Sequence, residues 1–146
     1  MNYRKASGAD LNQVAVLFDN YRIFYRKASD VDGAISFLKE RFKNEDSEIF
    51  VAEKENQLLG FVQLYPLYSS TRMKKLWLLN DLFVDSNQRG KGISVGLIDC
   101  AKQLVKETEA CGMFLETEKS NLIGNILYPK IGFKLNEESN YYEWNC

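Results

Sequence analysis

Apolar residues recur with two different spacings along this chain of 146 residues, and the alternation of these spacings predicts a mixed α/β fold. Helical spacing in the first third predicts one helix after Asp10 and a second from about residue 32. The apolar stripe of the first helix consists of Leu11, Val14, Phe18, Tyr21 and Tyr25. We expect Asp10 to cap this helix, and we expect the charged segment 43–48 to be a loop.

Runs rich in β-branched and aromatic residues predict strands at residues 3–6, 48–54, 58–65 and 76–84. Residues 55–57 separate the second and third runs and predict a hairpin turn, and Pro66 is expected to end the third strand. The fourth run is interrupted by Asn80 and Asp81. Because polar residues in a buried strand need partners or a function, these two are the first candidates for catalysis.

The second half of the chain predicts a long helix over residues 92–109, a short strand at 113–117 and a short helix after Asn121. Strand, helix and strand in this order give a right-handed crossover. Cys100 falls on the apolar stripe of the long helix and is expected in the core. Residues 141–144 alternate weakly and are expected to close the sheet as an antiparallel strand. No linker or repeat divides the sequence, so residues 1–146 are expected to form a single domain.

A glycine-rich turn joins the fourth strand to the long helix. Gly90 and Gly92 can adopt backbone angles that other residues avoid, so successive N–H groups can point into one concavity. The helix that follows adds its own unpaired N–H groups and the positive end of its dipole. The turn therefore predicts a phosphate site, with Arg89 and Lys91 adding charge at its rim; a purely structural turn is the alternative. The glycine spacing matches neither the dinucleotide fingerprint nor the P-loop.

Composition narrows the remaining choices. With 45% hydrophobic residues the chain can bury its own core, and a net charge of −1 with interspersed signs gives no field that would recruit nucleic acid. Histidine is absent, which removes the usual general base and zinc ligand, so we expect no metal. The 3 cysteines lack metal spacing and predict reduced thiols in a cytoplasmic protein. No apolar stretch of about 18 residues predicts a membrane span.

The order of motifs resembles one known family. A Gln-Arg-Gly-Lys-Gly-Ile turn at residues 88–93 is followed by a helix, a strand, Asn121, Tyr128 and then Gly132-Phe133. Together these features resemble the GNAT superfamily of acetyl-CoA-dependent N-acetyltransferases, closely over roughly the last 65 residues. The resemblance implies a GNAT fold, with a mixed twisted sheet of about six to seven strands flanked by about four helices. Segments 21–25, 63–66 and 77–84 look similar to the branch that includes histone, polyamine and D-amino-acid acetyltransferases.

The resemblance also implies roles for particular residues. The turn would bind the pyrophosphate of acetyl-CoA, through residues that act as N–H donors or as their neighbours: Gln88, Arg89, Gly90, Lys91, Gly92, Ile93 and Ser94. The pantetheine arm would run beside Leu82, Phe83 and Val84 and contact Asn121. A splayed or bulged end of that strand would free an N–H for the oxyanion. Tyr128 matches the general acid that protonates the departing thiolate; an aromatic core residue is its alternative reading.

The base is less clearly marked. Removing the proton of a primary alkylammonium at pH 7 costs about 4.6 kcal/mol, and without histidine the leading acceptor is a carboxylate acting through water. Asp81 is the acidic residue inside the central strand, and a structural role is its alternative. Residues 80–84 resemble a stretch of diamine acetyltransferases, and Asn80 occupies the position at which those enzymes have their catalytic glutamate. Asn80 cannot act as a base.

Aromatic and polar residues are the candidates for binding the acceptor, either through ring contacts with a cation or as ordinary core residues. They are Tyr21, Phe24, Tyr25, Gln63 and Tyr65. The sequence thus predicts transfer of acetyl from acetyl-CoA to a small-molecule amine by direct attack in a ternary complex. A protein lysine or N-terminal acetyltransferase and a non-catalytic CoA-binding module are the alternatives. The resemblance also implies that the chain can form a homodimer.

Overall fold

The computed structural model describes residues 1–146 as two compact units, Met1–Leu115 and Glu116–Cys146. The first unit contains β1 (Asn2–Lys5), η1 (Gly8–Asp10), α1 (Leu11–Phe24), α2 (Val31–Asn44), β2 (Glu48–Lys54), β3 (Gln57–Ser69), β4 (Lys74–Val84), η2 (Ser86–Gln88), α3 (Ile93–Glu107) and β5 (Met113–Phe114). The second unit contains α4 (Leu122–Lys130). None of these helices combines the length and hydrophobicity needed to cross a bilayer.

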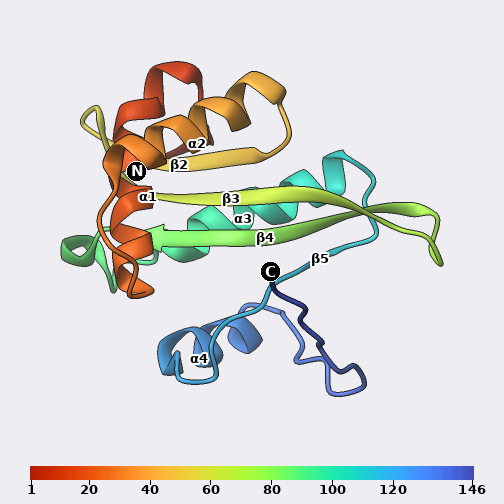
Figure 1. The fold of residues 1–146 in the computed structure, drawn as a ribbon. Coiled ribbons are helices and arrows are strands. Elements are labelled where there is room, and N and C mark those ends of the chain that lie inside the picture. Colours follow the sequence, from red (N-terminus) through yellow and green to blue (C-terminus); the bar gives the residue numbers. More distant parts are fainter. The chain divides into compact units, whose positions relative to one another are not determined.

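The sheet has five strands in the order β1-β2-β3-β4-β5, with antiparallel neighbours except for the parallel pair β4 and β5. Helices α1 and α2 lie over one face and α3 lies over the other (Figure 1). The mixed α/β fold is therefore confirmed, with fewer strands than expected. Residues 141–144 form no strand. Tyr141 and Tyr142 are consecutive and would point to opposite faces of a strand, and they are 70% and 85% exposed.

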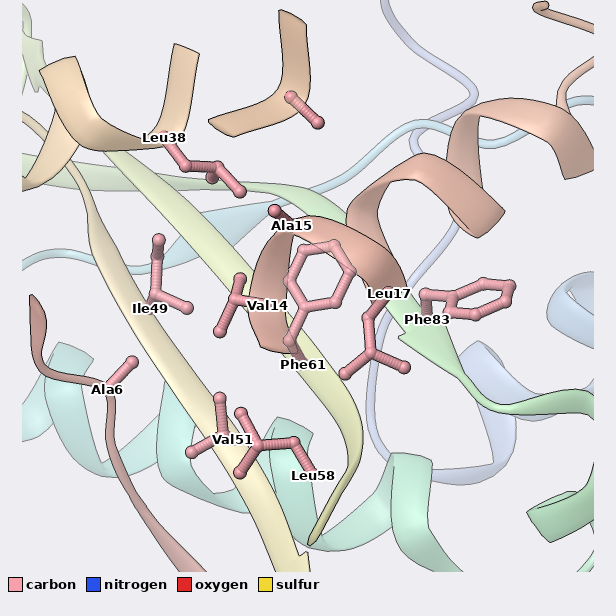
Figure 2. Close-up of a cluster of buried hydrophobic side chains, with 11 residues drawn as sticks. Ala6, Val14, Ala15, Leu17, Leu38, Ile49, Val51, Leu58, Phe61 and Phe83 are labelled. Carbon is pink, nitrogen blue, oxygen red and sulfur yellow. The ribbon is translucent and has the colours of Figure 1, made fainter. Parts of the chain in front are cut away.

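The core between the sheet and helices α1 and α2 is built from aliphatic side chains around Phe61 and Phe83 (Figure 2). Val14 of α1, Leu38 of α2 and Phe61 of β3 are completely buried. Burying a side chain of this size contributes about 1.5–3 kcal/mol. This packing fixes the C-terminal half of α1 above β3 and β4, where Phe18 and Tyr21 both approach Phe61 at 6.2 Å between ring centroids.

Strand β3 continues through Pro66 to Ser69, so the expectation that Pro66 ends it is wrong. Pro66 pairs with Trp77 of β4, and the Trp77 N–H points away from β3, toward Gly112. The pair is therefore of the non-hydrogen-bonded kind, in which both backbones face outward. Strand β2 has already ended at the pair Glu48–Leu64, so the missing N–H of Pro66 faces an open edge.

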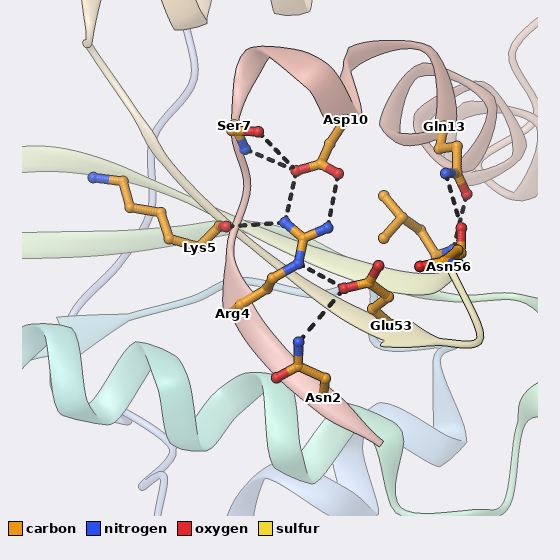
Figure 3. A network of polar contacts seen from close by, with 9 residues as sticks. Asn2, Arg4, Lys5, Ser7, Asp10, Gln13, Glu53 and Asn56 are labelled. Carbon is orange, nitrogen blue, oxygen red and sulfur yellow. Dashed lines mark hydrogen bonds and ion pairs between the residues drawn. The ribbon is translucent and has the colours of Figure 1, made fainter.

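A polar network ties the first strand to the start of α1 (Figure 3). The Arg4 guanidinium donates to both carboxylate oxygens of Asp10, at 2.7 and 2.9 Å, and its Nε donates to Glu53 at 2.7 Å. The Ser7 N–H also donates to Asp10, at 2.8 Å. Asp10 therefore accepts hydrogen bonds from Arg4 and from Ser7 at the start of η1. Contrary to the expectation, its side chain makes no capping bond to α1. These hydrogen bonds, that from Arg4 above all, lower the pKa of Asp10 to about 2.

Other boundaries differ by a few residues. Helix α2 runs to Asn44, into the segment expected to be a loop, and β5 covers two residues of the five expected. Helix α3 packs closely on the sheet because Gly96 has no side chain: a Cβ there would overlap the ring of Tyr3. Cys100 is only half-buried on α3, whereas Ile98 is completely buried, so Cys100 lies at the margin of the core.

Candidate active site

A β-bulge places the two polar residues of β4 in different environments. Gln63 pairs with Asp81 and the next residue of β3, Leu64, pairs with Leu79, which leaves Asn80 as the extra residue on β4. Before the bulge, Trp77 faces α3 and donates from Nε1 to Thr108 at 2.9 Å. After the bulge, Asp81 faces α1. The bulge thus turns a carboxylate toward the helical layer of α1 and leaves Asn80 exposed.

Asp81 is 4% exposed and is held by donors on several sides. Gln63 Nε2 donates to its Oδ2 at 2.7 Å, Asn80 Nδ2 donates to its Oδ1 at 3.1 Å, and the Tyr21 hydroxyl also bonds the carboxylate. Ser47 donates to Gln63 Oε1 at 2.9 Å and so orients the amide with its N–H toward Asp81. Burial raises the pKa of Asp81 and outweighs the lowering by these donors.

Tyr65 lies half-buried on the same stretch of β3. Burial, followed by the nearby negative charge of Asp81, raises the pKa of Tyr65 to about 12. The phenol therefore keeps its proton at physiological pH and does not act as a base beside Asp81.

The end of α1 contributes a cluster of rings beside Asp81. Tyr21 contacts Tyr25 edge-to-face, with ring centroids 5.1 Å apart, and approaches Phe83 at 6.4 Å. Tyr25 in turn contacts Phe24 at 5.2 Å. Phe24 is 50% exposed, so its ring offers apolar surface to solvent. All three aromatic residues that the sequence assigned to the acceptor on α1 therefore lie together.

The glycine turn has the geometry of an anion cradle. Gly90 and Gly92 adopt φ of 78° and 77°, the left-handed region that favours glycine. Gly92 precedes α3, which has no side-chain cap. The backbone N–H groups of residues 89–95 have no hydrogen-bond acceptor within the protein. Several unpaired donors at the positive end of a helix dipole form a site that suits phosphate oxygens.

One of the two charged side chains of the turn is arranged differently from the expectation. Arg89 Nε donates to the Val84 carbonyl at 3.2 Å, and its guanidinium lies 5.4 Å from the ring centroids of Phe24 and Phe83. It therefore folds back onto the protein and joins the cradle to α1. Lys91 donates to Gln88 Oε1 at 2.9 Å and remains exposed at the rim.

One edge of β4 is open beyond its short pairing with β5. The two strands pair only at Trp77–Met113 and Leu78–Phe114. The Asp85 N–H donates to Leu59 of β3, so by alternation the N–H groups of Leu82 and Val84 face the open edge. This edge offers backbone partners to an extended ligand, with the carbonyl of Val84 already bonded by Arg89.

In the second unit, Asn121 and Tyr128 both lie next to Gly124. Asn121 caps α4 by accepting from the Gly124 N–H at 3.1 Å, and its amide donates to Thr117 at 2.9 Å. A Cβ at Gly124 would come within 2.6 Å of the Asn121 amide nitrogen and 3.2 Å of the Tyr128 ring. Tyr128 is helical although Pro129 follows it, and its ring meets Phe133 edge-to-face at 5.7 Å.

Comparison with known proteins decides the family. The family model described as Acetyltransferase (GNAT) family matches residues 14–133. The chain belongs to the GNAT acetyltransferase family. It is 42% identical over 134 residues to YhfO, an uncharacterized N-acetyltransferase of Bacillus subtilis (strain 168), covering 92% of this chain and 90% of the relative.

Solved structures agree with this assignment. The crystal structure of a probable acetyltransferase matches this GNAT protein with a TM-score of 0.94 and 34% identity, over 100% of this chain and 98% of the other. A predicted acetyltransferase with acetyl-CoA from Clostridium acetobutylicum has the same fold, with a TM-score of 0.80 and 20% identity over 99% and 95% of the two chains.

The sequence marked most of the groups that this GNAT structure brings together. Tyr21, Gln63 and Tyr65 surround Asp81, and the cradle residues follow directly after the strand. Asn121 and Tyr128 lie in the second unit. Sequence reasoning missed Ser47, which has no motif and meets Gln63 only through the pairing of β2 and β3. It also missed the inward fold of Arg89, because Phe24 lies on α1, far from Arg89 in the sequence, and only Phe83 lies near it.

Proposed function

We propose that this GNAT acetyltransferase transfers the acetyl group of acetyl-CoA to a primary amine of a small molecule, a polyamine or an amino-acid-like compound, by direct attack in a ternary complex. The observation that carries the proposal is the buried, hydrogen-bonded carboxylate of Asp81, which the bulge turns toward the rings of α1. A purely structural strand would gain nothing from a buried carboxylate, because burial disfavours its charge.

The proposed acetyl-CoA site follows from the donors of the first unit. The N–H groups of the cradle and the amine of Lys91 would bind the pyrophosphate, and the open edge of β4 would pair with the pantetheine arm. The Leu82 N–H would then be available to stabilise the oxyanion that forms on the acetyl carbonyl. In the second unit, Asn121 would contact the arm.

Proton transfers supply the remaining chemistry. An alkylammonium must lose a proton before it attacks, at a cost of about 4.6 kcal/mol at pH 7. Asp81 is the proposed acceptor, because a carboxylate with a raised pKa is a stronger base than an exposed one. Tyr128 is the proposed donor to the thiolate, since a phenol stays protonated at neutral pH while a thiolate of pKa near 8.5 takes up a proton.

The acceptor side of the proposal rests on the rings of α1. Tyr21, Phe24 and Tyr25 present faces that attract a cation, and Asp81 adds a negative charge behind them. Such a site suits a compact cationic amine. Gln63 is completely buried, so its proposed part is to hold Asp81, without touching the acceptor.

The test is to incubate the protein with acetyl-CoA and a panel of polyamines, amino acids and lysine-containing or free N-terminal peptides while thiol release is followed. Turnover with a small amine supports the proposal. Turnover with peptides alone would identify a protein acetyltransferase. CoA binding without release from any acceptor would overturn catalysis and identify a binding module, an outcome consistent with Asn80 at the position of a catalytic glutamate.

A further inference from the structure

We propose that the Tyr21 hydroxyl carries the proton of the acceptor amine to Asp81, which makes Tyr21 a catalytic residue in addition to part of the aromatic packing. This inference rests on the proposed function, because it assigns the step by which the same site deprotonates its acceptor. It assigns that step to a side chain of α1 in place of a water molecule.

Solvent reaches the Asp81 carboxylate only past the groups that bond it. Asp81 is 4% exposed, and its carboxylate already receives hydrogen bonds from Gln63, Asn80 and Tyr21. Gln63 is completely buried, whereas Tyr21 is only partly buried and Asn80 is exposed. An amine that approaches from solvent therefore meets the Tyr21 hydroxyl or the Asn80 amide before it meets the carboxylate.

The Tyr21 hydroxyl and the Asn80 amide differ in their capacity to pass on a proton. The Asn80 amide nitrogen is a donor only, so it cannot accept a proton from the amine and pass another one on. A hydroxyl donates one hydrogen and accepts through its lone pairs, so Tyr21 can do both at once. Among the groups that bond Asp81, Tyr21 alone combines partial exposure with this capacity.

The Tyr21 hydroxyl has two acceptors for its one hydrogen. Besides the Asp81 carboxylate, the Tyr21 oxygen lies 3.3 Å from the Asn80 carbonyl oxygen. While Asp81 is ionised, the hydroxyl hydrogen can point to the carboxylate. Once Asp81 is protonated, the hydrogen can turn to the Asn80 carbonyl and remain bonded. The bulge at Asn80 therefore provides a resting position for the relay after transfer.

The step balances without a further reactant. An N–H bond of the ammonium breaks as an O–H bond forms on Tyr21, while the original Tyr21 O–H bond breaks as an O–H bond forms on Asp81. Tyr21 is neutral before and after the transfer, the amine becomes neutral, and Asp81 becomes a neutral acid. The amine lone pair is then free to attack the acetyl carbonyl.

The test compares Tyr21→Phe with the wild type, using the best alkylamine of the panel and a weakly basic primary amine that is already neutral at pH 7. Phenylalanine keeps the ring that meets Tyr25, Phe61 and Phe83. With the alkylamine, kcat/KM at pH 7 is expected to fall more than about tenfold, and the deficit is expected to shrink toward pH 10. With the weakly basic amine, the loss is expected to stay below roughly threefold, because no proton has to be removed before the amine attacks. Tyr68→Phe removes an exposed hydroxyl from β3 and is expected to leave both activities unchanged.

Equal losses with both amines at every pH would show a structural role for Tyr21, and unchanged kinetics would remove the hydroxyl from the proton path; either result overturns the relay. If the wild type acetylates no acceptor, the proposed function itself fails and the relay fails with it. That pattern differs from the first two because the wild type itself is then inactive.

Discussion

Gln63 donates a side-chain hydrogen bond of 2.7 Å to Asp81, and the two side chains are 0% and 4% exposed. Donors of this kind favour the ionised carboxylate, but loss of hydration disfavours it, and burial prevails so that the pKa of Asp81 is raised. The ionised form of Asp81 is therefore less favourable in the folded protein than in the unfolded chain. The proposed role of Asp81 as a base opposes stability at this position.

Asp81→Asn separates the two effects. An acid whose folded pKa is raised stabilises the fold only at low pH, and that contribution is lost as pH rises from the unfolded value of about 3.9 through the folded value. We expect Asp81→Asn to match the wild type in unfolding free energy below pH 4 and to exceed it increasingly at higher pH, as measured by urea denaturation. Loss of the base is expected to lower kcat/KM by about a hundredfold or more.

The exposed Asp99 on α3 provides the control. Asp99→Asn is expected to keep full activity and to show no such widening with pH. If Asp81→Asn lowered the unfolding free energy by the same amount at every pH, the Asp81 side chain would stabilise the fold through packing, and its charge would not destabilise the fold.

The cofactor cradle depends on backbone angles that side chains oppose. Gly92 has a φ of 77°, and nothing beyond its chain neighbours lies within 4 Å of the place that a Cβ would occupy, so strain and not collision decides which residue fits. We expect Gly92→Val to lower CoA affinity by about tenfold or more, because β-branched residues avoid this region, and Gly92→Asn to lose less. Titration calorimetry with CoA measures both.

Gly112→Ala serves as the matched glycine replacement, because Gly112 has equally open surroundings and no positive φ. Its CoA affinity is expected to equal that of the wild type. Valine tolerated at position 92 would mean that CoA is not bound by the backbone of this turn.

The cradle could be predicted because its requirements are local. Gly90 and Gly92 are needed where the chain takes positive φ, and the strand and helix on either side carry clear periodicities. The polar interruption of β4 was also visible. The contact of Asp81 with Gln63 could not be predicted, because it depends on strand register, and one extra residue at Asn80 changes which side chains share a face.

Non-local partners explain the incorrect expectations too. Asp10 is of a residue type that often caps helices, but Arg4 on β1 forms a bidentate ion pair with it that local propensity cannot predict. Pro66 is expected to end its strand, yet its backbone nitrogen faces an edge that is open because β2 ends earlier. Both outcomes were decided by which strands lie next to one another.

The Arg4–Asp10 pair gives a stability effect with the opposite pH dependence. Arg4 lowers the pKa of Asp10 to about 2, so its stabilising contribution is full above the unfolded pKa of about 3.9 and is lost as pH falls through about 2. We expect Arg4→Met to reduce the unfolding free energy by about 2 kcal/mol at pH 7, with the difference disappearing toward pH 2. Urea denaturation across this range provides the measurement.

Lys5→Met removes a neighbouring ion pair, that with Glu48, in which the lysine is largely exposed. Exposed pairs contribute little, so a loss within about 0.5 kcal/mol is expected. A pH-independent loss in Arg4→Met would assign the effect to the packing of the arginine stem and not to the charge of Asp10.

Tyr128→Phe tests the proposed acid. Phenylalanine keeps the edge-to-face contact with Phe133 and removes only the hydroxyl, so CoA affinity is expected to be unchanged while kcat at pH 7 falls more than about tenfold. The deficit should shrink above a pH of about 8.5, where a thiolate leaves without being protonated. Tyr141→Phe, which alters an exposed tyrosine of the same unit, is expected to retain full turnover.

The basicity of the acceptor amine distinguishes the role proposed for Tyr128 from the role proposed for Tyr21. A weakly basic amine is already neutral before it attacks but leaves the thiolate unchanged, so it should rescue Tyr21→Phe and fail to rescue Tyr128→Phe. Rescue of both variants by the same amine would mean that Tyr128 acts on the amine, and rescue of neither would assign both hydroxyls to positioning. Because each variant keeps its ring, a difference between them reports on the two hydroxyl groups.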